Sequence, residues 1–356
     1  MGMQHGRQLG DLIRAGLRSH GHDLDKSAEP VKEDAVNVLI EKHREIVNGI
    51  RPELFEEMEG VAEGAGADYD SLLGMFLGRE LPYGIAGPSS QSIGEECTAW
   101  LAAGEATVGM EPMLAQNRDC PYDSGQYRIV ILAKPAEGNS FVATGRAGSN
   151  DGYGVNDKGL AISSPAVRPS DSVEARKTGK PPGVQSYSLA RMVLQECSSV
   201  GQAIDLIKRT PPGYMGLNWM LADKDNEVAR VERSFTRINI VYPEDASYPT
   251  NKVIGSANHY SSREMSHLAP AIRPSTKMRY DRIATLLTSR AGQIDFNSFK
   301  GYARDHANGP GHLSICNHGD TSGTNLSMIA QCRRSRLWVL RGSPCLNEFV
   351  AYDCPG

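Results

Sequence analysis

The character of the chain changes at residue 97. Residues 87–96 are rich in glycine, serine and glutamate, whereas the aromatic and β-branched side chains of residues 97–101 favour a strand. A second extended run, residues 113–119, follows after a connection that contains glycine. The two runs predict a β-hairpin, in which Cys97 at the start of the first strand and Asp119 at the far end of the second are neighbours across the pair.

A cysteine in this position permits a specific kind of chemistry. If the chain breaks between Glu96 and Cys97, the freed α-amine is a base beside the Cys97 thiol, and pairing a nucleophile with such a base is a recurring catalytic arrangement. An α-amine titrates near ~7.7–8.0, so it exchanges protons close to neutral pH, which a lysine at ~10.4 does not. The residues alone also allow Cys97 to be a small buried side chain at the start of a core strand.

The order of the predicted elements indicates the fold class. The first ninety residues are mostly helical, and after the hairpin runs of strands alternate with helix pairs. Residues 170–183, rich in proline, serine, lysine and glycine, are predicted to form an exposed loop. This order predicts an α+β protein with two stacked antiparallel sheets between helical layers. The predicted helices cover residues 7–17, 35–50, 52–66, 68–76, 186–197, 200–209, 278–287 and 296–303, and the later strands cover residues 127–133, 140–144, 154–155, 159–163, 218–222, 228–232, 237–241, 254–259, 327–331 and 335–340.

Composition argues against several classes of partner and location. The net charge is −4 over 356 residues and the basic residues are scattered, so we expect no nucleic acid and no anionic membrane as a partner. No apolar run approaches the ~20 residues of a membrane helix, and no secretory signal is recognisable, so a reducing cytoplasm is the expected setting. The opening residues 1–6 resemble the interior of a longer segment, which leaves open a preceding N-terminal strand. No CxxC pair occurs among the seven cysteines, which are residues 97, 120, 197, 316, 332, 345 and 354.

One group of potential metal ligands occurs near the C-terminus. His306, His312, Cys316 and His318 suggest a zinc site, yet their spacing fits none of the compact zinc patterns. A structural role is the preferred interpretation, and we expect neither a metal nor a cofactor.

Several separated stretches together resemble one family. The chain is similar to the isopenicillin N acyltransferase-like (C45) branch of the N-terminal nucleophile (Ntn) hydrolases, and more distantly to the penicillin V acylase and bile salt hydrolase branch. The stretches occur in the family's order over almost the whole chain. They are Gly2-Met3-Gln4-His5-Gly6, residues 57–66, Cys97-Thr98, Gln116-Asn117-Arg118-Asp119, residues 156–160, Asn258-His259-Tyr260, Ser314-Ile315-Cys316 and Gly342-Ser343-Pro344-Cys345.

The resemblance implies a four-layer αββα Ntn-hydrolase sandwich and a self-processing enzyme. Autoproteolysis would cut between Glu96 and Cys97. It would give a helical α segment, residues 1–96, and a catalytic β segment, residues 97–356, that stay associated as one compact unit.

The resemblance also implies a role for each matching site residue. Cys97 would be the nucleophile and its own amine the general base, while Asp119 would hold that amine through a charge-assisted hydrogen bond. Asn258 would donate its side-chain amide to the developing oxyanion. Arg279 would favour the thiolate through its permanent charge, with Arg282 as the competing assignment. Four neighbours are possible supporting residues: Asn117, Gln116, Thr98 and His259.

The chain departs from the family pattern at three positions. Glu96 precedes the cysteine where acyltransferases of the family usually have glycine, and its carboxylate would either repel the thiolate or accept a proton during self-cleavage. Arg118 replaces the usual aromatic residue. Gln116 stands where bile salt hydrolases have arginine, so bile salts are a poor substrate prediction.

The predicted function is acyl transfer or amide hydrolysis. Cys97 would take the acyl group from an amide or thioester of a small N-acyl or peptide-like metabolite and pass it to an amine or to water. Two alternatives remain: an uncleaved, inactive family member that acts as a binding or scaffold protein, and a full-length thiol hydrolase that pairs Cys97 with a histidine such as His259. The sequence leaves the oligomeric state open, including a homo-oligomer.

Overall fold

The computed structural model describes residues 1–25, 41, 44–45, 47–78, 96–150, 152–245, 252–269 and 271–356. The polar loop before Glu96 and most of the helix predicted for residues 35–50 lie outside the described residues.

The first sheet contains the predicted hairpin. Its six strands are all antiparallel to their neighbours, and the strand that carries Cys97 lies inside the sheet rather than at its edge. Two predicted hairpins are confirmed, the one that carries Cys97 and the one near the C-terminus. The last strand of the sheet was not predicted. The order is β11 (Val253–Ser256), β1 (Glu96–Ala102), β2 (Met113–Pro121), β12 (Ser322–Gln331), β13 (Arg336–Arg341) and β14 (Val350–Asp353).

The second sheet packs against the first. Strands β1, β2, β12 and β13 of the first sheet contact strands of the second, so the two sheets stack face to face. Its main path is β10 (Ile238–Val241), β9 (Val228–Arg233), β8 (Gly216–Ala222), β6 (Ala161–Ser163), β5 (Tyr153–Asn156), β4 (Phe141–Arg146) and β3 (Arg128–Ala133), with β7 (Ala166–Val167) paired to β8.

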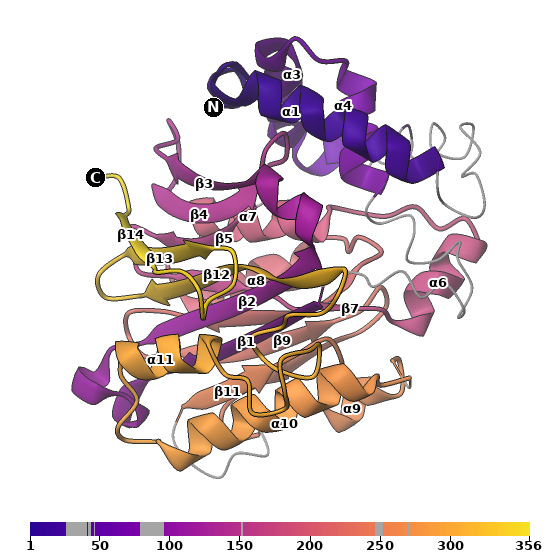
Figure 1. Ribbon diagram of the computed structural model, residues 1–356. Helices are drawn as coiled ribbons and strands as arrows, with labels where there is room; N and C mark the ends of the chain where they lie inside the picture. Colours follow the sequence, from indigo (N-terminus) through magenta and orange to yellow (C-terminus); the bar gives the residue numbers. More distant parts are fainter. Residues whose placement is uncertain are drawn as a thin grey trace.

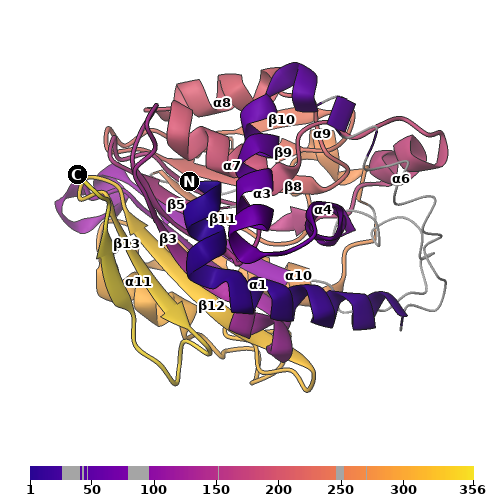
Figure 2. The same cartoon turned by 90° about the horizontal axis from the view of Figure 1, so that it is seen from above.

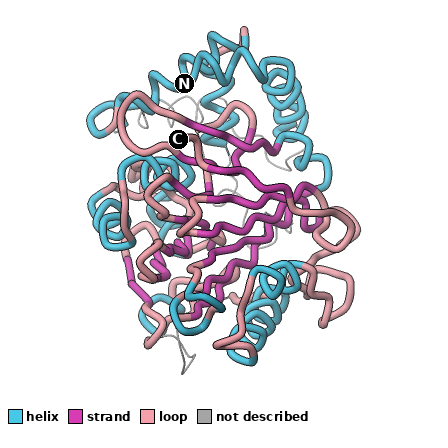
Figure 3. Tube along the Cα trace, turned by 90° about the vertical axis from the view of Figure 1, so that its left-hand side faces the viewer, coloured by secondary structure: helices cyan, strands magenta, loops and turns pink. Residues whose placement is uncertain are grey.

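Helices cover the outer faces of both sheets (Figures 1 and 3). Helices α10 (Pro274–Ser289) and α11 (Phe296–Ala303) contact the first sheet, and α7 (Ser186–Glu196) and α8 (Val200–Arg209) contact the second. This arrangement is the four-layer αββα sandwich, so the predicted fold class is confirmed. The remaining short helices are η1 (Gly104–Ala106), η2 (Val108–Met110), η3 (Tyr122–Tyr127) and α9 (Arg263–Ser266).

The alternation of side chains along β1 builds two separate cores. Ala99 and Leu101 belong to the large core between the sheets, whereas Trp100 and Ala102 pack with the residues of α10 and α11. All four side chains are fully buried, because both faces of this strand are covered. A strand buried on both faces is held firmly in place, and Cys97 stands near its start.

The N-terminal helices form one packed group, which Figure 2 shows from above. Helix α1 (Gly2–Asp25) crosses α3 (Pro52–Ala65) so closely that a Cβ atom added at Gly6 would lie 2.3 Å from the Val61 carbonyl oxygen. The third helix of the group is α4 (Tyr69–Gly78). Four glycines of the first two family-like stretches therefore serve this crossing: Gly2, Gly6, Gly60 and Gly64.

One prediction about residues 170–183 is wrong. Residues Ser170–Lys177 form helix α6 rather than a loop, and Ser172 and Ala175 are buried. Asp171 anchors the helix by accepting hydrogen bonds from the Ser234 hydroxyl at 2.6 Å and the Thr236 backbone N–H at 2.9 Å. With so few apolar residues in eight positions, the sequence carries no helical periodicity to detect.

Among the described residues, no helix combines the length and the apolar character needed to cross a lipid bilayer.

Candidate active site

Cys97 is fixed through its backbone at the second position of β1. Its N–H donates to the side-chain carbonyl of Asn258 at 2.8 Å, and its own carbonyl accepts from Nη1 of Arg279 at 2.5 Å. The residue is 3% exposed. In the intact chain, the peptide groups on both sides of Cys97 are thus positioned while its thiol is shielded from solvent.

Helix α10 supplies the arginine of the site. Arg279 is fully buried and also donates to the Thr98 hydroxyl at 2.8 Å and to the Glu96 carboxylate at 2.9 Å. Arg282, the competing sequence assignment, forms a bidentate ion pair with Asp305 on the partly exposed side of the helix. The structure therefore places Arg279, and not Arg282, against the Glu96–Cys97 bond.

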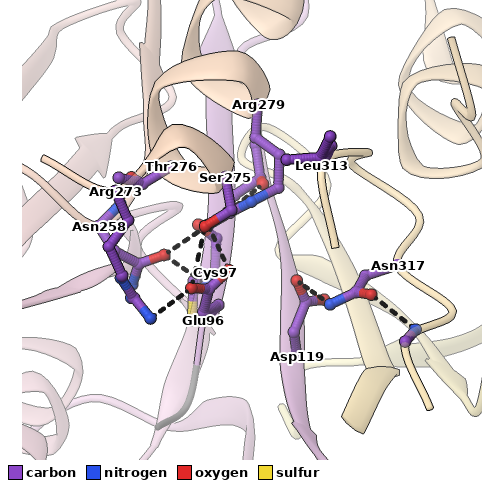
Figure 4. A network of polar contacts seen from close by, with 12 residues as sticks. Glu96, Cys97, Asp119, Asn258, Arg273, Ser275, Thr276, Arg279, Leu313 and Asn317 are labelled. Atoms are coloured by element: carbon purple, nitrogen blue, oxygen red, sulfur yellow. Dashed lines mark hydrogen bonds and ion pairs between the residues drawn. The ribbon is translucent and has the colours of Figure 1, made fainter. Parts of the chain in front are cut away.

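Two arginines and a serine surround the carboxylate of Glu96, as Figure 4 shows. Besides Arg279, Arg273 forms an ion pair with it at 2.7 Å and the Ser275 hydroxyl lies at 3.2 Å. Ser275 is in the first turn of α10, where the positive end of the helix dipole also favours an anion. The repulsion of a thiolate expected from the sequence is therefore balanced by two arginines.

Asn258 follows β11 and connects three parts of the site. Its side-chain oxygen accepts from Cys97 and from Nη2 of Arg279 at 3.1 Å, while its side-chain nitrogen donates to the Ala166 carbonyl at 2.9 Å. Its backbone N–H donates to the Thr276 hydroxyl at 2.7 Å. In the intact chain the amide expected to stabilise an oxyanion is thus directed to Ala166.

The position of Asp119 differs by one residue from the sequence expectation. Asp119 pairs with Glu96 across the β1–β2 ladder, and Cys97 pairs with Arg118, so the side chains of Cys97 and Asp119 point to opposite faces of the sheet. Asp119 accepts from the Thr324 hydroxyl at 2.6 Å and from the Asn317 amide at 3.3 Å. It lies within β2, opposite Glu96.

Burial raises the pKa of Asp119 to about 6, while the charge of Arg279 and the hydrogen bond from Thr324 oppose this rise. The carboxyl therefore changes its charge close to neutral pH, in the range where acid–base groups are useful.

A β-bulge in β12 allows Thr324 to reach Asp119. The register of β12 against β2 shifts between Thr324, which pairs with Asp119, and Leu326, which pairs with Arg118. One extra residue in the strand returns Leu326 to the core between the sheets while Thr324 stays on the opposite face.

Comparison with known proteins identifies the family. The sequence model of the family described as acyl-coenzyme A:6-aminopenicillanic acid acyl-transferase matches residues 107–345, about two thirds of the chain. The chain belongs to this family. The resemblance seen in the sequence is confirmed, and the chain is an enzyme that transfers acyl groups or hydrolyses amides. The matched range includes Asp119, Asn258 and Arg279 but begins downstream of Cys97.

Three solved structures are similar to this acyltransferase-family chain. Penicillin V acylase from Agrobacterium tumefaciens is 16% identical, with 72% of this chain and 86% of that chain covered and a TM-score of 0.45. The Caenorhabditis elegans ortholog of N-acylethanolamine-hydrolyzing acid amidase is 16% identical, with 68% and 100% covered and a TM-score of 0.47. A conjugated bile acid hydrolase variant from Clostridium perfringens is 13% identical, with 73% and 97% covered and a TM-score of 0.46. No curated protein sequence matches the chain.

The possible supporting residues hold neighbouring segments together. The Asn117 amide donates to the carbonyls of Ala303 and Ile315, both at 2.9 Å, and Thr98 accepts from Arg279. Gln116 connects the two sheets by donating to the Ser164 carbonyl at 3.0 Å. His259 lies near Thr276, with 2.9 Å between Nδ1 and the hydroxyl, and burial and the charge of Arg230 lower its pKa to about 4.

The sequence did not predict that Arg118 lies on the same face of the sheet as Cys97. This arginine is 3% exposed, and its guanidinium lies 5.4 Å from the ring centroid of Tyr153 and 5.7 Å from that of Tyr187. Because side chains alternate along a strand, the pairing of Cys97 with Arg118 places both side chains on the face toward the second sheet. A strict period of two, counted from Leu114 in the core between the sheets, would have placed Arg118 on this face.

Proposed function

We propose that the chain cuts itself between Glu96 and Cys97 and then uses Cys97 as an N-terminal nucleophile in acyl transfer or amide hydrolysis. One observation carries the proposal. The backbone N–H and carbonyl of Cys97 are both held by site residues while its side chain is buried in the intact chain. A buried thiol cannot reach an external acyl donor, whereas cleavage at Glu96 frees the chain that precedes it.

In the proposed self-cleavage, a thioester forms first and is then hydrolysed. The Cys97 thiol attacks the Glu96 carbonyl carbon, the bond to the Cys97 nitrogen breaks, and that nitrogen gains the thiol proton, which gives a thioester. Water then hydrolyses the thioester, releasing a new carboxylate at Glu96 and restoring the thiol. The contacts that support these steps are the ion pairs of Glu96 with Arg279 and Arg273 on one side of the bond and the Asn258 hydrogen bond on the other.

After cleavage, the nitrogen and sulfur of Cys97 serve catalysis. The new α-amine occupies the position of the Cys97 nitrogen, where the Asn258 oxygen already accepts a hydrogen bond and Asp119 lies across the strand pair. As general base, the amine takes the thiol proton while sulfur attacks the acyl donor, and it returns the proton to the leaving amine. An amine or water then takes the acyl group from Cys97.

The α segment is proposed to remain bound after cleavage. Ile13, Val61 and Leu72 share one continuous core with residues between the two sheets. The ion pair between Glu57 and Arg191 of α7 joins the segments at 2.9 Å, and Arg51 pairs with Glu196 of the same helix. Burial of this extent is enough to hold a cut chain together.

We propose a small N-acyl or peptide-like metabolite as the acyl donor. Family membership supports an acyl amide, and Gln116, which binds the backbone of Ser164, stands in place of the arginine that the resemblance gives to bile salt hydrolases. No cofactor is needed for the proposed steps, and the setting we propose is cytoplasmic.

The alternative of a full-length thiol hydrolase is less well supported. With a pKa of about 4, the His259 ring is a weak base at neutral pH, because burial and the charges of Arg230 and Arg279 oppose its protonation. An inactive scaffold is distinguished by the absence of turnover.

Covalent trapping tests the proposed catalysis. Processed enzyme is mixed with N-acyl 4-nitroanilides of increasing chain length, with and without an added amine, and rapidly quenched samples are analysed by mass spectrometry under denaturing conditions. We expect one acyl group on the peptide that begins with Cys97, and no acyl-enzyme or turnover in Cys97→Ala. The Cys354→Ser variant is the matched control and should retain both. Equal turnover by Cys97→Ala and wild type would refute the assignment.

A further inference from the structure

Four thiol and imidazole groups meet at one place outside the reaction centre. They belong to His306, Cys316, His318 and Cys345, and their potential ligand atoms all lie within 4.8 Å of one another. Nε2 of His318 is 3.5 Å from the Cys316 sulfur and 3.1 Å from the Cys345 sulfur. The rings of His306 and His318 stack with centroids 5.1 Å apart.

The donor set and the spacing fit one metal in particular. In a tetrahedral zinc site, bonds of roughly 2.0–2.3 Å place the ligand atoms about 3.3–3.8 Å apart, close to the separations seen around His318. Two thiols and two imidazoles are soft to intermediate donors, which select zinc over the oxygen-seeking magnesium and calcium ions. A closed set of four protein ligands is typical of structural rather than catalytic zinc.

We propose that His306, Cys316, His318 and Cys345 bind one structural Zn²⁺. The two thiols lose their protons on binding, so the metal is held by two thiolates and two neutral imidazoles.

The ligands come from three segments that hydrogen bonds already bring together. The Cys316 N–H donates to the Asp305 carbonyl at 3.0 Å, next to His306. Nε of Arg304 donates to the Pro344 carbonyl at 2.9 Å, next to Cys345. A zinc ion at this point would join the turn after α11, the loop before β12 and the turn after β13.

The proposed site lies next to the residues that hold Asp119. Asn317 stands between two of the ligands and donates to Asp119 at 3.3 Å, as Figure 4 shows. Its backbone also exchanges hydrogen bonds with Thr324, the other partner of Asp119. The zinc would thus act as a positioning element, because it fixes the loop that presents Asn317.

The sequence expectation of no metal rested on spacing. It included His312, which is exposed and does not belong to the cluster, and it left out Cys345, which is distant in sequence from the other ligands. His312 therefore provides a control histidine from the same loop.

Metal content tests the proposal directly. The full chain is produced without a histidine tag, dialysed against metal-free buffer and analysed for zinc by mass spectrometry, beside Cys345→Ser, Cys316→Ser and His312→Ala. We expect about one zinc per chain in wild type and in His312→Ala, and a loss of most of the zinc in both cysteine variants. Equal zinc in wild type and in a folded Cys345→Ser variant would overturn the proposal, as would zinc-free wild type that takes up none when zinc is added.

Two measurements on wild type keep the test decisive if a variant fails to fold. X-ray absorption at the zinc edge should show two sulfur neighbours at ~2.3 Å and two nitrogen neighbours at ~2.0 Å. Thiol alkylation of the denatured, unreduced chain should label both Cys316 and Cys345. A disulfide between these two cysteines, or a zinc shell made only of nitrogen and oxygen, would contradict the proposal.

Discussion

At the scale of single residues, the buried charge of Glu96 is the most demanding feature of the site. Glu96 is 5% exposed, and its carboxylate contacts Arg279, which has no exposed surface. A buried ion pair contributes little in net terms, but removing one partner leaves the other charge buried without compensation. The identity of residue 96 therefore matters for stability as well as for the proposed cleavage.

We predict that Glu96→Gln lowers the free energy of unfolding by about 3 kcal/mol, because Arg279 loses its counter-charge. Urea denaturation of the Cys97→Ala chain with and without Glu96→Gln measures this difference. We expect no cleavage in this background. The matched control is Asp281→Asn, which removes the exposed ion pair with Lys277 on the same helix and should cost less than ~0.5 kcal/mol. Similar losses for the two substitutions would contradict the structural account.

The second residue-scale prediction concerns pH. Since burial raises the pKa of Asp119 to about 6, the carboxyl is ionised above that pH and neutral below it. In the proposed mechanism an ionised Asp119 stabilises the amine that forms during cleavage, so we predict that the rate of self-cleavage falls as the pH drops through about 6. Refolding the chain from urea into buffers of different pH and timing the cleavage gives the profile.

The Thr324→Val variant tests the direction of this pH dependence. Thr324→Val removes a hydrogen bond that lowers the pKa of Asp119, so the acid limb of the cleavage profile should move to higher pH. Ser327→Ala is a control from the same strand, because its hydroxyl donates to Asn117 rather than to Asp119. An unchanged limb in Thr324→Val would show that another group titrates there.

At the scale of elements, the site depends on where β1 meets the first turn of α10. Strand β1 presents Glu96 and Thr98 on the face toward α10, and Ser275 and Arg279 of that helix reach them. The opposite face of β1 presents Cys97 toward the second sheet. One strand thus directs the Glu96 carboxylate toward the arginine of α10 on one face and the Cys97 side chain toward the second sheet on the other.

The crossing of α1 and α3 provides an element-scale prediction. Gly6→Ala places a methyl group 2.3 Å from the Val61 carbonyl oxygen, so the helices must separate, at a cost of about 1–3 kcal/mol. In the same helix, Gly16→Ala meets only the Tyr127 ring at 3.5 Å and should be neutral or stabilising by up to ~1 kcal/mol. Thermal unfolding of the two variants measures the difference. Equal melting temperatures would show that the close crossing is not required.

At the scale of the whole molecule, the sequence predicted the elements better than their mutual placement. Most strands and helices follow from local periodicity, which depends only on neighbours in the chain. The pairing of Asp119 with Glu96 instead of Cys97 depends on a one-residue register that periodicity does not determine. Arg118 was therefore considered only as a departure from a family pattern.

The parts of the site that were missed come from segments distant in sequence. Arg273 and Ser275 join Glu96 because α10 packs on β11 and β1, and Thr324 reaches Asp119 through a bulge. Likewise, β12 and β13 separate Cys345 in sequence from His306, Cys316 and His318, which it meets in the folded chain. Such contacts follow from tertiary packing, and local spacing does not predict them.

The central claim is that the chain processes itself before Cys97, and intact mass under denaturing conditions tests it most directly. We predict that purified wild type consists of two fragments, of 96 and 260 residues, whose masses place the break between Glu96 and Cys97. The Cys97→Ala chain should remain whole at 356 residues, and the Cys354→Ser control should be cut like wild type. A single intact chain in wild type, or the same two fragments in Cys97→Ala, would contradict self-processing by Cys97.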